Sequence, residues 1–161
     1  MKEVPTWIFL DVDGVLNCNS TTELTPEGFT GVEDGKIALL AELVRETGAK
    51  VVLTSDWKDQ SLWWREKNPG SDLTYLSNRL TEHGVEIEAY TRDGDRGRAV
   101  QDWMKKNPGL YVIFDDHWVG SYAAAGVAGY LVQTTMKDGL QPKHVWRARQ
   151  ILEMQKRKGD E

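Results

Sequence analysis

Short apolar runs that alternate with helical patterns constrain the fold of this 161-residue chain more than any other feature. Most of the runs are apolar nearly throughout, which is typical of strands covered on both faces. The third run instead alternates between apolar and polar residues, which favours an edge strand. The strands that we expect are Trp7–Asp11, Lys50–Thr54, Val85–Tyr90, Leu110–Phe114 and Ala128–Val132.

Helical spacing of apolar residues fills the intervals between these runs. Gly48, Gly84 and Pro108 supply the stops that follow the first three helical patterns. Strands that alternate with helices predict an α/β fold: a doubly wound, Rossmann-like parallel sheet of about five strands with helices on both faces. The chain length suits one domain over residues 1–161. The helices that we expect carry Ile37 to Val44, Leu73 to Leu80, Val100 to Met104 and Val145 to Leu152.

A group of polar residues is expected where the apolar runs end. Ligands of parallel α/β sheets lie beyond the carboxyl ends of the strands. Carboxylates gathered there would repel one another, and a divalent cation would relieve that repulsion. Oxygen ligands favour Mg²⁺, which keeps several of its waters. The polar residues that follow the first, second and fourth runs are Asp11, Asp13, Thr54, Ser55, Asp56, Asp115 and Asp116.

These groups suit phosphoryl transfer, which asks mainly for positioning and neutralisation of charge. Gly14 allows a sharp turn that brings backbone amides toward an anion. Arg96 is expected to complete the phosphate site, with Arg98 as the competing candidate. Asp11 and Asp13 can point the same way from a strand end, so one carboxylate could act as nucleophile and the other as general acid and base.

Four segments of the chain resemble the motifs of the haloacid dehalogenase-like (HAD) superfamily of phosphohydrolases. They occur in the family's order and read DVDGVLN, VVLTSDW, RGRAV and VIFDD. Each segment is a weak signal alone, whereas four in order at predicted strand ends or helix starts are specific together. Within the superfamily, the chain resembles small bacterial and phage members and the phosphatase modules of RNA-repair systems.

The resemblance implies roles for single residues. It implies Asp11 as the nucleophile and Asp13 as the general acid and base. It implies Thr54 as the phosphate-binding hydroxyl, with Ser55 as a helper. The third motif supplies a basic residue, for which we favour Arg96 over the neighbouring arginine, although the family more often has lysine there.

The resemblance also implies the cofactor and the reaction. The family metal is Mg²⁺, and the expected ligands are Asp11, Asp115, Asp116 and the backbone carbonyl of Asp13. We therefore expect a Mg²⁺-dependent phosphatase that hydrolyses phosphomonoesters through an aspartyl-phosphate. The expected substrate is a small phosphate ester or a phosphorylated nucleic-acid end.

The chain offers little sequence for a cap that would close over the site. Residues 17–34 read as a polar loop, and residues 57–84 leave room for a small cap or insert at most. Within the second span, Trp63 and Trp64 could stack on a nucleotide, with Arg65 and Lys67 beside them. The competing interpretation is an ordinary helix with one tryptophan packed and one partly exposed.

Other functions and settings stay open at this point. A phospho-accepting receiver-like signalling module has a similar sheet and clustered acids, and an inactive HAD scaffold could bind a partner. Asp11 and Asp13 could also be turn residues, and Thr54 and Ser55 could be helix caps. The net charge of −5 disfavours a broad nucleic-acid surface. We expect a cytoplasmic protein, since we find no signal peptide and no apolar run long enough to span a membrane.

Overall fold

Five parallel strands form a single sheet in the order β3-β2-β1-β4-β5. The structure, a computed structural model, describes residues 4–57, 72–92 and 94–160. The strand that precedes the DVDG motif lies at the centre, and the alternating third run lies at an edge. The parallel α/β sheet is therefore confirmed. The strands are β1 Thr6–Leu10, β2 Lys50–Leu53, β3 Ile87–Tyr90, β4 Leu110–Asp115 and β5 Leu131–Gln133.

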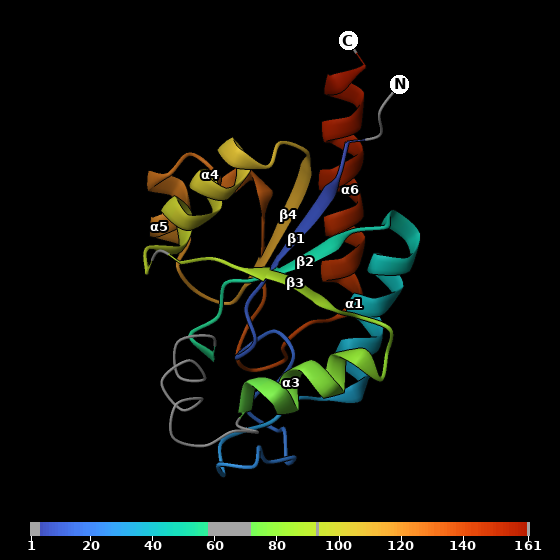
Figure 1. Ribbon diagram of the computed structural model, residues 1–161, viewed down its shortest axis with the longest axis vertical. Coiled ribbons are helices and arrows are strands. Elements are labelled where there is room, and N and C mark those ends of the chain that lie inside the picture. The colour runs from blue at the N-terminus through green and yellow to red at the C-terminus, as the bar shows by residue number, and fades with distance from the viewer. Residues whose placement is uncertain (1–3, 58–71, 93, 161) are drawn as a thin grey trace.

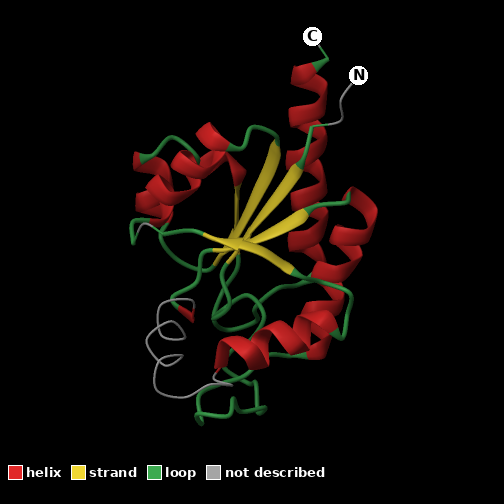
Figure 2. Cartoon of the chain, viewed as in Figure 1, coloured by secondary structure: helices red, strands yellow, loops and turns green. Residues whose placement is uncertain are grey.

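Helices cover both faces of the sheet (Figure 1). The helices on one face are α1 Asp34–Thr47, α3 Asp72–Thr81 and α6 Pro142–Gly159. The helices on the other face are α4 Arg96–Lys106 and α5 Val119–Ala124. Figure 2 shows the strands as a twisted fan between these two groups of helices. Among the described residues, no helix is both long enough and apolar enough to cross a membrane.

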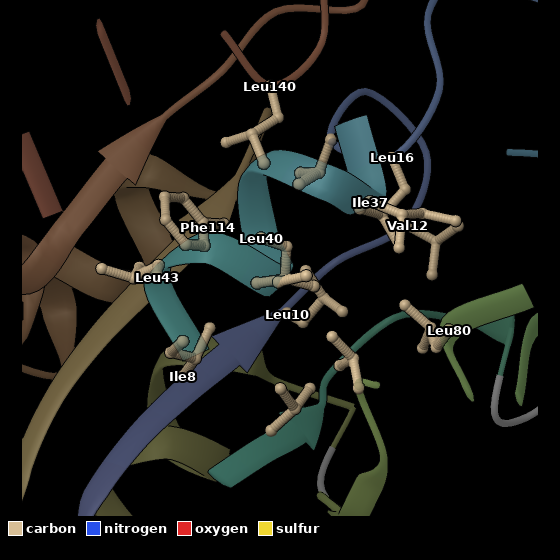
Figure 3. Close-up of a cluster of buried hydrophobic side chains, with 14 of the residues drawn as sticks. Ile8, Leu10, Val12, Leu16, Ile37, Leu40, Leu43, Leu80, Phe114 and Leu140 are labelled. Atoms are coloured by element: carbon tan, nitrogen blue, oxygen red, sulfur yellow. The ribbon is translucent and has the colours of Figure 1, made fainter. Parts of the chain in front are cut away.

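Successive residues of β1 enter two different cores, because side chains alternate across a strand. Ile8 and Leu10 belong to the larger core, which includes side chains of α1, α3 and α6. Figure 3 shows this core, with Ile37 and Leu40 of α1 near them. Trp7 and Phe9 instead belong to the core under α4 and α5. This explains why the runs are apolar nearly throughout.

The third strand begins at Ile87 rather than at Val85, and two parts of the fold near β5 also differ from the expectation. The last strand begins at Leu131, because Ala128–Tyr130 form a 3-10 helix before it. The six-residue helix α5 was not expected, because its sequence VGSYAA is too short to show a repeated apolar spacing. Both differences lie at the edge of the sheet where local sequence signals are weakest.

The possible insert at residues 57–84 is described in part. Residues 58–71, which include Trp63, Trp64, Arg65 and Lys67, lie outside the described residues. The described remainder forms α3, and its leucines pack into the larger core.

Candidate functional site

The register of the sheet brings three polar residues to one level. Leu10 of β1 pairs with Leu53 of β2 and with Phe114 of β4. These three side chains belong to the larger core, so the residues that follow them turn toward the opposite face, under α4 and α5. The residues at this next level are Asp11, Thr54 and Asp115.

Backbone hydrogen bonds hold that level in place. The Asp11 amide donates to the carbonyl of Phe114 at 3.0 Å, and the Thr54 amide donates to the carbonyl of Leu10 at 2.9 Å. The hydrogen bonds between neighbouring strands thus continue one residue beyond the apolar runs. The positions of the polar side chains are consequently fixed by the same pairing that builds the core.

Asp11, Asp115 and Asp116 form an acid cluster at this edge of the sheet. Each offers one carboxylate oxygen, and these oxygens all lie within 4.8 Å of one another. Asp115 is fully buried, and Asp11 is 4% exposed. The Asp116 carboxyl group packs against Gly14, where a Cβ would overlap it. The φ of +79° at Gly14 is a second reason for glycine there.

Arg96 is the basic partner of the acid cluster. Its Nη1 lies 3.1 Å from Oδ1 of Asp11 and 2.7 Å from Oδ2 of Asp115. Its Nη2 lies 3.4 Å from the carboxylate of Asp56, whose side chain is largely exposed. Arg98 is exposed, and its backbone amide donates to Asp95, which precedes α4. Of the two arginines, the structure therefore brings Arg96 to the acids.

Burial and mutual repulsion dominate the electrostatics of the acid cluster. Burial raises the pKa of Asp11 well above its ordinary value, Asp115 raises it further, and Arg96 offsets part of this rise. Burial also raises the pKa of Asp116, with a smaller contribution from Asp115. Burial opposes the charge of Arg96, but the two nearest acids outweigh it and keep the pKa of Arg96 above its ordinary value. The fold by itself therefore disfavours the charged forms of Asp11 and Asp116.

The acid cluster fits a divalent cation. Three carboxylate oxygens converge within 4.8 Å, and all the donors are oxygen atoms, as Mg²⁺ prefers. A cation there would also favour the ionised form of Asp11 and Asp116, whose pKa values are raised in its absence.

Asp13 lies apart from the acid cluster. Its side chain is exposed, and both of its oxygens accept hydrogen bonds from neighbouring side chains. Asn17 Nδ2 donates to Oδ1 at 2.9 Å, and Trp57 Nε1 donates to Oδ2 at 3.1 Å. The side-chain oxygen of Asn17, Oδ1, accepts a hydrogen bond from the Gly14 backbone amide at 2.9 Å. The two aspartates of the DVDG motif thus point to different surroundings.

The two hydroxyl residues after β2 also differ. Thr54 is buried at the level of Asp11. Ser55 is buried as well, and its hydroxyl accepts a hydrogen bond from the backbone amide of Trp57 at 3.2 Å. Of the two residues, Thr54 therefore lies at the level of Asp11, and the Ser55 hydroxyl is engaged in a local turn.

A comparison with known families agrees with this geometry. The family described as the HAD domain in Swiss Army Knife RNA repair proteins matches residues 7–145. The chain belongs to this family. The match confirms the resemblance to the HAD superfamily and includes all four motifs. Membership points to hydrolase chemistry of the phosphatase type. No curated protein gives a significant match.

Tyr122 is a residue of this HAD domain that sequence reasoning missed. Its hydroxyl donates to Oδ2 of Asp115 at 2.7 Å, and its side chain is fully buried. The backbone amide of His117 donates to the other oxygen of the same carboxylate at 3.0 Å. Asp115 is thereby fixed from two sides. No sequence signal pointed to Tyr122, because it lies on the unexpected helix α5.

Trp118 is the second missed residue of the HAD domain. Its ring lies over the guanidinium of Arg96, with 5.2 Å between the Arg96 Cζ and the ring centroid. Its φ is +68°, and no other non-glycine residue in the described part of the chain has a positive φ. Such strain in a bulky residue is typical of functional sites. The available signal was its place directly after the segment VIFDDH.

Proposed function

We propose that this HAD domain is a Mg²⁺-dependent phosphatase that hydrolyses phosphomonoesters through an aspartyl-phosphate on Asp11. One observation supports this most: three carboxylates converge within 4.8 Å, while Arg96 lies 3.1 Å from Asp11. A nucleophile, a cation site and a phosphate-binding base thus meet at one point of the sheet edge.

The proposed cation site consists of the acid cluster, together with the backbone carbonyl of Asp13 that the HAD resemblance implies. Bound there, Mg²⁺ would neutralise charge on the phosphoryl oxygens. Arg96 and Thr54 would bind the other phosphoryl oxygens. The Nη2 of Arg96 lies 3.4 Å from the carboxylate of Asp56, whose side chain is largely exposed.

In the first proposed step, an oxygen of the Asp11 carboxylate attacks phosphorus in line. The bond between phosphorus and the leaving oxygen breaks, and Asp13 gives that oxygen a proton. In the second step, Asp13 takes a proton from a water molecule whose oxygen attacks phosphorus. The bond to Asp11 then breaks with its electron pair, which regenerates the carboxylate and releases inorganic phosphate.

The surroundings of Asp13 suit its proposed role. A general acid must reach the leaving oxygen of the substrate, and the exposed Asp13 follows Asp11 by two residues. Asn17 and Trp57 fix both of its oxygens, so the carboxylate is oriented before substrate binds.

The proposed substrates are nucleotides or phosphorylated nucleic-acid ends. The description of the matching family as a domain of RNA repair proteins supports this class. A competing proposal is an inactive HAD scaffold that binds a partner. The receiver-like module has no support from the family match, which is to a HAD domain.

Trapping the intermediate tests the proposal. Asp13→Asn should accumulate phosphoryl-enzyme with p-nitrophenyl phosphate, because this leaving group needs little protonation while the second step lacks its base. Rapid acid quench and mass spectrometry would show the added phosphoryl group on the peptide that contains Asp11. Asp11→Asn is the matched control and should show none. Absence of the adduct in both variants, together with no phosphate release by the unaltered protein, would favour the inactive scaffold.

A further inference from the structure

A pocket of about 410 Å³ lies directly beside Asp13. Its lining includes Asn17, Trp57, Phe29 and Met136. Its volume lies within the range of small-molecule sites. Asp13, Asn17 and Trp57 come from the first two motifs, whereas Phe29 and Met136 belong to no motif.

The pocket shares residues with the surroundings of the proposed general acid, Asp13. Asn17 and Trp57, the two side chains that donate to the carboxylate of Asp13, both line the pocket. A general acid must contact the oxygen that joins phosphorus to the leaving group. A substrate with its phosphate at Asp11 and its leaving oxygen at Asp13 therefore places its leaving group in this pocket.

One wall of the pocket belongs to a small hairpin, residues 24–30. Leu24 and Thr30 form an antiparallel bridge at its base. The Thr25 amide donates to the carbonyl of Phe29 at 2.8 Å, and the Phe29 amide donates to the hydroxyl of Thr25 at 3.0 Å. This tight turn holds Phe29 in place although its side chain is 55% exposed.

The hairpin is docked on α3, beside which it lies in Figure 1. The Glu27 amide donates to Asp72 at 3.3 Å, and the Val32 amide donates to the hydroxyl of Tyr75 at 3.2 Å. Asn17 also reaches the hairpin side, since its Nδ2 donates to the carbonyl of Gly31 at 2.8 Å. An exposed phenylalanine on such a fixed support is placed for contact with a ligand.

The chemistry of the lining favours an uncharged leaving group with a flat apolar face. Phe29 and Met136 expose 55% and 40% of their surface, and amide groups of asparagine residues lie near them. The lining also contains the carboxylates of Asp13 and Asp72, and none of its described residues is lysine or arginine. A nucleoside combines a base that can stack on Phe29 with polar edges that amides can bind.

We propose that this pocket is the leaving-group site and that it binds the nucleoside that carries the scissile phosphate, with its base against Phe29. The inference rests on the proposed phosphatase function and assigns the residues that bind the leaving group at that same site. The preferred substrates are then nucleoside monophosphates and the terminal nucleotides of a strand, rather than phosphate esters without an aromatic ring.

Phosphate release measured with three substrates tests this. The substrates are p-nitrophenyl phosphate, glycerol phosphate and nucleoside monophosphates, each nucleoside as its 3′ and 5′ isomers. We expect kcat/KM for the better nucleotide isomer to exceed that for glycerol phosphate by about tenfold, the scale of one stacked base. Phe29→Ala should reduce this ratio by about tenfold, whereas Phe29→Tyr should retain it.

Leu24→Ala is the matched control. Leu24 belongs to the same hairpin and is 62% exposed, but it does not line the pocket, so the ratio should be unchanged. Hydrolysis of p-nitrophenyl phosphate with no preference for nucleotides, or with a ratio that Phe29→Ala leaves unchanged, would overturn the pocket assignment and leave the phosphatase standing. Failure to hydrolyse any of the three substrates would instead overturn the proposed function, and the pocket assignment with it.

Discussion

Asp11 and Asp13 are separated by one residue, yet they lie in different surroundings. Asp11 is buried in the acid cluster, bonded to Arg96 and level with Asp115 in the sheet. Asp13 is exposed and is oriented by Asn17 and Trp57. The first carboxylate is positioned by strand register, and the second by side chains of a loop. Substitution of Asp11 itself should therefore bear on both activity and stability, whereas substitution of Asp13 itself should alter mainly activity.

The largest expected effect separates the two aspartates directly. Asp11→Asn should reduce phosphate release by about a thousandfold or more, because it removes the proposed nucleophile. The Tm of the metal-free variant should stay the same or rise at neutral pH, because the fold raises the pKa of Asp11 and so disfavours its charged form. Asp13→Asn should also lose turnover but leave the Tm unchanged. A lower Tm for Asp11→Asn would show that its ion pair with Arg96 outweighs the repulsion.

Loss of the loop contacts tests how Asp13 is held. Asn17→Ala should lower kcat about thirtyfold, within the range of one general acid–base group, and should destabilise the fold by about 1–3 kcal/mol. The stability loss follows because the Gly14 amide and the Gly31 carbonyl lose their buried partner. Trp57→Phe removes one donor to Asp13 and keeps a ring in place, so kcat should fall while denaturant unfolding changes by about 1 kcal/mol. Equal kcat in both variants and the unaltered protein would contradict the proposed orientation of Asp13.

The pH dependence of metal binding tests the acid cluster that contains Asp11. The raised pKa values of Asp11 and Asp116 mean that protons compete with a cation at pH values where an ordinary aspartate is ionised. Mg²⁺ affinity should therefore be weaker at about pH 5.5 than at about pH 7.5. Calorimetric titration measures it, and Asp13→Asn should keep the same dependence because its side chain lies outside the acid cluster. Affinity that is equal at both pH values would exclude the acid cluster as the cation site.

The raised pKa values of Asp11 and Asp116 also make the stability of the metal-free protein depend on pH. Raised carboxyl pKa values in the folded state favour the protonated forms, so stability should fall as the pH rises through those values. Added Mg²⁺ should restore it at neutral pH. Thermal unfolding with and without a chelator measures this, and chelation should also stop turnover reversibly.

The smallest expected effect concerns Trp118. Trp118→Ala should raise KM about threefold, because Arg96 loses the ring that lies over its guanidinium. Trp118→Gly should raise KM equally but should be more stable than Trp118→Ala by about 1 kcal/mol, because glycine adopts the positive φ without strain. Equal stability of the two variants would show that the backbone at this position is not strained.

The central part of the fold and site could be predicted because both follow from local patterns. Runs such as WIFL and YVIF are apolar throughout because both faces of their strands are covered. The acids that follow them meet because parallel strands in register end together. Arg96 could be preferred from its place at a helix start, but only the contacts with Asp11 and Asp115 distinguish it from Arg98.

The remaining parts depend on contacts between distant residues, which local patterns do not reveal. Tyr122 reaches Asp115 from a six-residue helix without a repeated apolar spacing. The hairpin reads as a polar loop in the sequence, and it takes shape because α3 supplies Asp72 and Tyr75 as partners. The hydrogen bond from Trp57 to Asp13 also joins distant residues, so the sequence did not reveal it.

The loop that contains the hairpin begins and ends at neighbouring points of the fold. The Glu33 amide donates to the carbonyl of Leu16 at 2.9 Å, so the chain returns beside its point of departure before α1 starts. Such a closed base makes the exposed part of this loop exchangeable: another sequence could replace the hairpin, residues 24–30, while Gly31 and Val32 keep their buried contacts. A different preference for the leaving group could therefore evolve on this fold without a change to the sheet.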